Sequence, residues 1–258
     1  MSIIWDEINK SVIPIKGYED LYRRMHTSFE YPFVGNKFNF SLPQLIDYTR
    51  LGVGGDPQGR YTEYASNLIR IFTELHKAGV QNTLDLMALV ETHQTLEEFC
   101  EKCPISGQDI VSAVKYLIYW FIPMEKYMSG LVKDDPVIRD ALKVLRGIGI
   151  RTNLGLLQRG IHKAERKALA DESGLPEAEI EEWINRADLS RLPWASRATI
   201  SNIMGAGYGS LARLANANPE QLFEDFYRYG KSIGKNLKFG NEIENSHRIA
   251  KIVPVILQ

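Results

Sequence analysis

Two glycines that flank one aliphatic residue form the pattern in this chain with the clearest chemical use. Gly147, Ile148 and Gly149 follow Leu145, and the pair Gly160-Ile161 begins eleven residues after Gly149. A tight Gly-x-Gly turn between two short helices directs backbone N–H groups outward, where they hold a phosphate as a helix N-terminus does. The spacing therefore predicts contact with the phosphates of nucleic acid. The expected site comprises Arg146, Gly147, Ile148, Gly149, Ile150, Arg151, Thr152, Lys163, Arg166 and Lys167.

Charge is distributed unevenly along the chain. The formal net charge of the whole protein is −1 at pH 7, which gives no long-range attraction for nucleic acid. Residues 1–135 contain 13 Lys and Arg against 18 Asp and Glu, whereas residues 136–258 contain 18 against 14. The basic excess therefore lies in the half that contains the glycine turn. A solvated helix surface also produces a basic cluster, and charge alone favours that simpler interpretation.

Helix signals recur along most of the chain. Apolar residues lie on one helical face over residues 65–78, and Gly79 follows as a C-terminal glycine would. Ser106 and Asn218 are typical N-caps of further helices. Alternation typical of a strand occurs only near residues 33–40. The sequence predicts an all-α protein with two domains, residues 1–135 and residues 136–258, and the acidic pair Asp134-Asp135 marks the boundary between them.

An internal repeat relates the two halves. A shift of 70 residues without a gap aligns apolar positions of two helices, for example Ile110 with Ile180. Earlier in the repeat the register is open. Gly79-Val80 aligns with Gly149-Ile150 under this shift, but Gly160-Ile161 is its better motif partner, which would imply that about eleven residues are missing from the second copy. A partial third copy begins near residues 206–208. Such repetition suits stacked helical hairpins, since one small unit cannot bury its own apolar face.

These motifs resemble a known family. Residues 145–258 are similar to DUF4332, a domain of unknown function built from tandem helix-hairpin-helix elements, and residues 62–120 resemble a more diverged copy. The resemblance implies small helical bundles of the SAM or helix-hairpin-helix type. The chain departs from the family at residues 193–196, Pro-Trp-Ala-Ser, where a second Gly-x-Gly turn is expected. The residues that carry the resemblance include Gly147-Ile148-Gly149, Gly160-Ile161, Trp183 to Arg191, Ala206-Gly207-Tyr208 and Asn218-Pro219.

Signals for catalysis and cofactors are weak. Cys100 and Cys103 form a single Cys-x-x-Cys pair with only His93 nearby, which is too few ligands for a structural zinc, so helix packing is the favoured role. The five histidines are scattered, and the glycine-rich residues 52–59 lack the Lys-Ser/Thr ending of a phosphate-binding loop. We therefore expect no metal, no cofactor and no enzymatic activity. Two cysteines and no export signal favour the cytoplasm, and no apolar run is long enough for a membrane span.

Three functions remain compatible with these patterns. The first is a non-enzymatic protein that binds DNA without sequence specificity, through backbone phosphates at the Gly147 turn. The second, nearly equal to the first, is a scaffold whose degenerate hairpins bind a protein partner. The third is a DNA-processing enzyme, which requires a carboxylate or lysine opposite the turn that the sequence does not identify.

Overall fold

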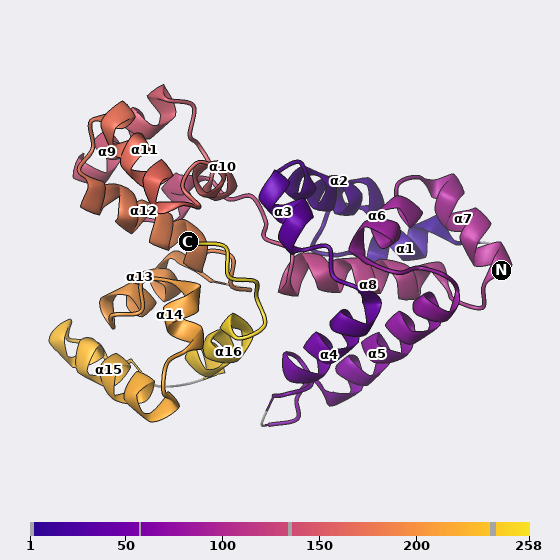
Figure 1. The fold of residues 1–258 in the computed structure, drawn as a ribbon. Coiled ribbons are helices and arrows are strands. Elements are labelled where there is room, and N and C mark those ends of the chain that lie inside the picture. Colours follow the sequence, from indigo (N-terminus) through magenta and orange to yellow (C-terminus); the bar gives the residue numbers. More distant parts are fainter. Residues whose placement is uncertain (1–2, 57, 134–135, 194, 238–240) are drawn as a thin grey trace. The chain divides into compact units, whose positions relative to one another are not determined.

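The computed structural model divides the chain into two compact units, Met1–Ile122 and Pro123–Gln258 (Figure 1). It describes residues 3–56, 58–133, 136–193, 195–237 and 241–258. The expected boundary between residues 135 and 136 falls inside the second unit, and Asp134 and Asp135 lie outside the described residues. All regular elements among the described residues are helices, as the sequence predicts. None of these helices is long and apolar enough to cross a membrane.

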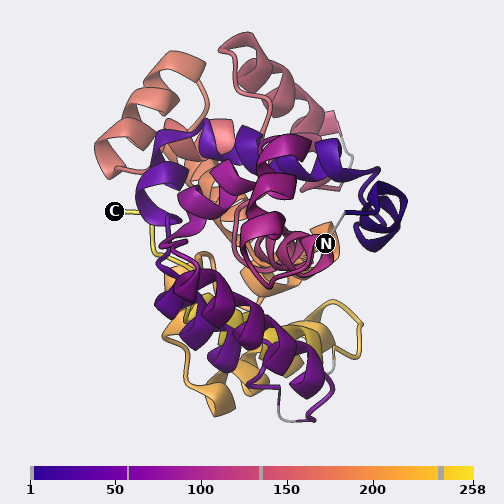
Figure 2. The same ribbon diagram turned by 90° about the vertical axis from the view of Figure 1, so that its right-hand side faces the viewer.

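The first unit is organised around its last helix, α8. This helix packs against α1, α2, α5 and α7, and its buried residues include Ile110 and Val114. A second close pair, α4 and α5, lies side by side in both views (Figure 1, Figure 2). The helices of this unit are α1 (Trp5–Ser11), α2 (Tyr18–Phe29), α3 (Pro32–Lys37), α4 (Leu42–Leu51), α5 (Thr62–Lys77), α6 (Thr83–Leu89), α7 (His93–Lys102) and α8 (Gly107–Trp120).

The second unit has α12 at its centre. This helix packs against α10, α11 and α13, and it buries Ile180 and Ile184, which the shift of 70 residues aligns with core positions of α8. The elements of this unit are the 3-10 helix η1 (Met128–Gly130), α9 (Pro136–Gly147), α10 (Asn153–Gln158), α11 (Lys163–Ser173), α12 (Glu177–Leu189), α13 (Arg197–Gly205), α14 (Leu211–Ala215), α15 (Pro219–Ser232) and α16 (Asn241–Ala250).

The helix ends follow local chemistry. Ser106 accepts a hydrogen bond from the Asp109 N–H at the start of α8, and Asn218 accepts from the N–H groups at the start of α15, as their N-cap roles predict. The strand-like alternation near residues 33–40 does not form a strand, in agreement with the all-α prediction, and residues 33–37 are helical. Pro32 occupies the first turn of α3, where its missing N–H costs nothing, and the apolar residues that follow are buried from a helix.

Candidate functional site

The Gly147 turn closes helix α9 in a Schellman motif. Gly149 has φ +84°, and its N–H donates to the Arg146 carbonyl at 3.1 Å. The next N–H, that of Ile150, reaches back to the Leu145 carbonyl at 2.9 Å. These two bonds satisfy carbonyls that the helix end leaves without partners. The Ile148 N–H also remains within the helix, donating to the Val144 carbonyl at 3.3 Å.

This geometry corrects the predicted phosphate cradle. The cradle requires the turn's N–H groups to be available to a ligand, whereas those of Ile148, Gly149 and Ile150 are bonded to carbonyls of α9. The surface above the turn is nevertheless open. Gly147 and Gly149 are not buried, and a Cβ added at either position would meet nothing within 4 Å. A ligand can approach the turn, but it must be held mainly by side chains.

The same turn occurs at two other helix ends. Gly79 after α5 has φ +99° and Gly207 after α13 has φ +98°. In each case the glycine N–H bonds three residues back and the following N–H bonds five residues back, as at Gly149. Gly79-Val80 therefore matches Gly149-Ile150 in geometry, which favours the ungapped shift for the open register. Gly160 is not among the glycines with positive φ.

A short backbone pairing follows two of these turns. Residues 40–42 pair with residues 81–83 through Leu42 N–H to Gln81 O and Thr83 N–H to Phe40 O, both at 2.9 Å. Residues 126–128 pair with residues 151–153 through the corresponding bonds at 3.0 and 2.9 Å. Both units therefore fix the start of the helix after the turn, α6 or α10, with an extended segment that precedes the turn in sequence.

The ten predicted site residues do not form one surface. Ile150 is 2% exposed and belongs to the core, so it cannot contact a ligand. Thr152 is half-buried, and its hydroxyl caps α10. Four side chains of the set form no ion pair and no hydrogen bond with any described residue: Arg146, Arg151, Lys163 and Lys167. The charged members of the predicted set that are exposed are Arg146, Arg151, Lys163 and Lys167.

Arg166 has a structural role instead of the predicted ligand contact. It is 7% exposed, and its Nη1 donates to the carbonyls of Gly160 and Ile161 at 3.0 and 2.9 Å. Its Nη2 donates to the Gln258 carbonyl, and its Nε lies 2.8 Å from a Glu181 carboxylate oxygen. The guanidinium thus ties α11 to the end of α10, to α12 and to the last residue of the chain, and this enclosure keeps it from a phosphate.

Arg159 belongs to the basic cluster of the sequence but not to the ten predicted site residues, and its role is structural. Its guanidinium donates to the Ile148 carbonyl at 3.0 Å and pairs with Glu172, in the last turn of α11. The C-terminal end of α11 therefore lies at the Gly147 turn. Lys163 begins the same helix, about 13 Å away along its axis. The predicted basic residues thus divide into Arg146 and Arg151 at the turn and a separate group on α11.

A cavity of about 330 Å³ lies beside α9. Aliphatic side chains of Val132, Ile138 and Leu142 line it, together with Ser129 from η1. Three cationic side chains of α9 also line it, Arg139, Lys143 and Arg146, spaced four and three residues apart on one helical face. Lys143 pairs with Asp140 at 2.8 Å on the surface, a contact of small energetic value. The α9 groove, as we call this cavity, therefore combines an apolar wall with a positive edge.

The helix beside the α9 groove has no close helical neighbour among the described elements. In the first unit α4 packs along α5, whereas among the described elements no helix packs along α9 to a similar extent. In the second unit, the segment that pairs with residues 151–153 leads only into η1, a single turn of three residues. The groove is thus a part of the α9 surface along which no described helix of the second unit packs closely.

Several other polar or reactive side chains lie in buried or half-buried surroundings. The Lys126 Nζ donates to the Ser190 carbonyl at 2.7 Å, and burial lowers the pKa of this lysine to about 8. In the first unit, Cys100 is buried and Cys103 half-buried, both as free thiols, and burial raises the pKa of Cys100. Pro193, at the departure from the family pattern, is half-buried, and Trp194 lies outside the described residues.

The two glycines of the turn are expected to respond oppositely to alanine. Gly149→Ala should lower the free energy of unfolding by about 1–2 kcal/mol, because an L-residue is strained at φ +84°. Gly147→Ala should be neutral or stabilising by up to about 1 kcal/mol, since this residue lies in α9 with open space around its Cα. Urea unfolding followed by circular dichroism measures both changes. Equal destabilisation by the two variants would contradict the Schellman geometry.

A comparison with known protein families matches the part of the chain that contains α9 and the Gly147 turn. Residues 136–240 match the model of a domain of unknown function, DUF4332. The matched range includes α9, its turn and the helices α10 to α15. No curated protein and no solved structure matches the chain.

Proposed function

We propose that this protein is a non-enzymatic protein-interaction module whose binding surface is the α9 groove. The observation that carries the proposal is an apolar cavity with a cationic edge beside α9, a helix along which no described helix packs as α4 packs along α5. A cavity of about 300 Å³ or more with apolar walls and few polar groups is the usual form of a binding site. The satisfied N–H groups of the Gly147 turn favour this function over a backbone phosphate cradle.

We also propose that the units descend from one helix-hairpin-helix-like repeat. Three Schellman turns of the same geometry, each followed within three residues by an N-cap and a short helix, support this. In this description residues 62–120 are a diverged copy of the second unit, and the turn retains its structural role in every copy. Ligand binding then depends on the surface beside the turn, which differs between copies.

A site-specific photo-crosslinker tests the protein-binding function. Ser129 is exposed and lines the α9 groove, so p-benzoylphenylalanine at this position reports what occupies the groove. Glu98, exposed on α7 in the first unit, provides the matched control position. In a nuclease-treated lysate of the cells that produce the protein, we expect a discrete protein adduct from position 129 and none from position 98. The double charge reversal Arg139→Glu/Arg146→Glu should reduce that adduct.

Two outcomes would contradict the proposal. Equal adducts from both positions would show that capture is non-specific. Loss of the adduct after nuclease treatment would show that nucleic acid, and not a protein, bridges the contact. The charge-matched variant Lys163→Glu/Lys167→Glu, on exposed positions of α11, should leave the adduct unchanged.

Nucleic-acid binding is the second candidate function, and one observation favours it. Arg146 and Arg151 flank an open turn, and among the described residues neither has an ionic partner. In the same set of experiments, labelled DNA titrated at several salt concentrations distinguishes the candidates. If both arginines contact phosphates, the slope of the logarithm of the DNA-binding constant against the logarithm of the salt concentration should decrease in magnitude by about 2 in Arg146→Ala/Arg151→Ala. Absence of binding at low ionic strength would remove this candidate.

A further inference from the structure

We propose that the occupant of the α9 groove is an amphipathic helix with an acidic flank, supplied by a protein partner. This inference rests on the protein-binding function proposed above and specifies the ligand class of the same site. It follows from comparing α9 with α5, the helix that occupies the equivalent place before the first Schellman turn. The comparison uses the shift of 70 residues that aligns Gly79 with Gly149.

The apolar positions of the two helices correspond. Leu68 and Phe72 of α5 align with Ile138 and Leu142 of α9, which line the groove. Leu68 and Phe72 are both 0% exposed, in the helix along which α4 packs. Ile138 is only half-buried. Leu142 is 6% exposed, so the part of the apolar face of α9 that stays accessible lies at Ile138. No described helix packs along α9 to the extent that α4 packs along α5.

The way α4 is attached indicates what the missing element is. α4 begins directly after the segment of residues 40–42 and buries Leu42, Leu45 and Thr49. The corresponding segment, residues 126–128, buries Met128 and then continues into η1 instead of a longer helix. A helix docked from another molecule would supply apolar residues at positions i, i+3 and i+7 to a groove, which is a common mode of peptide recognition.

Charge specifies the polar side of that helix. Arg139, Lys143 and Arg146 of α9 align with Ile69, Thr73 and His76 of α5, so the cationic edge belongs to α9 alone. α4 carries one acid and one base on its exposed surface, Asp47 and Arg50, which pair with each other at 2.8 Å. A helix that docks on α9 would face these three cationic side chains, of which Lys143 already pairs with Asp140, and acidic residues along its flank would complement this edge.

Stapled peptides test this inference on the full chain. The first peptide copies residues 41–51 of α4 with Gln44→Glu and Arg50→Glu, which keeps the N-terminal capping box because Glu follows Ser41 by three residues. The second carries Gln44→Lys and Asp47→Lys on the same apolar positions. Fluorescence anisotropy should show saturable binding of the acidic peptide and about tenfold weaker binding of the basic one. The variant Arg139→Glu/Arg146→Glu should bind the acidic peptide at least about tenfold more weakly than the wild type. The variant Lys163→Glu/Lys167→Glu should bind it with unchanged affinity.

The alternative occupants are outcomes of the same assay. Equal binding of both peptides, or an equal loss in the two protein variants, would overturn the inference. Binding of octanoate in place of the peptide would identify a site for a small aliphatic anion and would also overturn it. If position 129 crosslinks to a protein and the acidic peptide does not bind, this inference fails and the protein-binding function stands. If position 129 crosslinks to nothing, the proposed function itself fails.

Discussion

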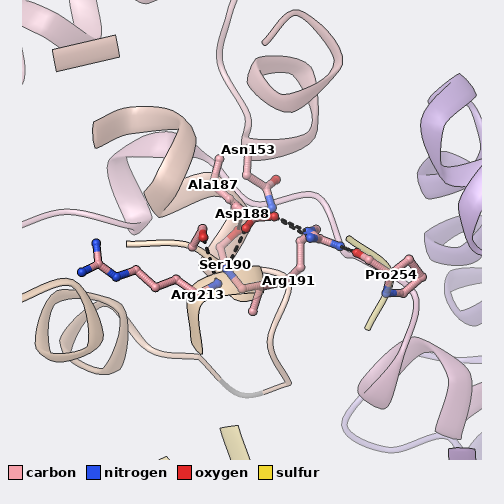
Figure 3. A network of polar contacts seen from close by, with 9 residues as sticks. Asn153, Ala187, Asp188, Ser190, Arg191, Arg213 and Pro254 are labelled. Atoms are coloured by element: carbon pink, nitrogen blue, oxygen red, sulfur yellow. Dashed lines mark hydrogen bonds and ion pairs between the residues drawn. The ribbon is translucent and has the colours of Figure 1, made fainter. Parts of the chain in front are cut away.

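Replacing Asp188 by alanine is expected to lower the free energy of unfolding of the second unit by about 3–5 kcal/mol. Asp188 is 2% exposed and Arg191 4% exposed, so the two charges form a buried pair. The Asp188 Oδ1 accepts a hydrogen bond from the Arg191 Nε at 3.0 Å, and a second guanidinium nitrogen reaches the Pro254 carbonyl at 3.0 Å (Figure 3). Removing the carboxylate leaves a buried guanidinium without its counter-charge, which is the costly way to break such a pair.

Asp188 also replaces a backbone contact that the other turns possess. Its Oδ2 accepts the Leu211 N–H at 2.9 Å at the start of α14. At the starts of α6 and α10, the corresponding N–H groups donate to the Phe40 and Lys126 carbonyls. The carboxylate thus takes the place of the extended segment that pairs after the other two turns. Alanine at this position would remove the acceptor together with the charge.

The measurement is urea unfolding monitored by circular dichroism, with Asp188→Asn and Asp171→Ala as matched variants. The Asp188→Asn variant would retain an acceptor for the Leu211 N–H and lose the charge, so an intermediate loss is expected. Asp171 is exposed on α11, and its truncation should change stability by less than about 0.5 kcal/mol. A loss below about 1 kcal/mol in Asp188→Ala would contradict the structural role of the buried pair.

The second large effect is expected for Asn153→Asp, a change of one side-chain atom. Asn153 is 0% exposed, and its Nδ2 donates to the Met124 carbonyl at 3.1 Å and to the Ser190 Oγ at 2.9 Å. Its Oδ1 accepts the Lys126 N–H at 2.7 Å. An ionised aspartate has no donor, so it would place a negative charge against the Met124 carbonyl. We expect a loss of about 3–5 kcal/mol at neutral pH.

Acid pH separates this mechanism from general disruption of the core. The buried carboxyl that Asn153→Asp introduces would have a folded-state pKa above its unfolded value, because its environment disfavours the charged form. The folded variant then binds more protons than the unfolded chain above the unfolded pKa, so its stability rises as pH falls. The stability gap to the wild type should therefore narrow on acidification. Asn153→Ala, which does not titrate at this position, is the control. If the difference in free energy of unfolding between the wild type and Asn153→Asp did not change with pH, the assigned hydrogen bonds would be contradicted.

The residues of these two predictions show the structural role of one segment that carries the family resemblance. The stretch Trp183 to Arg191 contributes Asp188, Ser190 and Arg191 to the buried network shown in Figure 3. Ser190 accepts from Asn153 and donates to the Ala187 carbonyl at 2.7 Å, and its own carbonyl accepts from Lys126. The buried side chains of Asp188, Ser190 and Arg191 therefore stabilise the junction of α10, α12 and α14, and a ligand cannot reach these three polar groups.

The sequence by itself determined the helices and their ends. The apolar period of residues 65–78 and the caps Ser106 and Asn218 act through contacts a few residues away, so they can be read without the fold. Gly149 was likewise identified as a turn residue from its position after an apolar helix. The recurrence of apolar positions after 70 residues was also visible in the sequence.

Only the tertiary structure decided which polar groups are available to a ligand. The N–H groups of the Gly147 turn are consumed by carbonyls of α9, Arg166 is enclosed between α11 and the last residue, and Lys163 lies at the far end of its helix from the turn. The α9 groove is lined by Ser129 of the three-residue turn η1 together with side chains of α9, which only the fold brings together. Composition and spacing specify what a residue can bond to. The packing of segments distant in sequence determines which of those bonds remain open, because each buried donor and acceptor takes the nearest partner inside the protein.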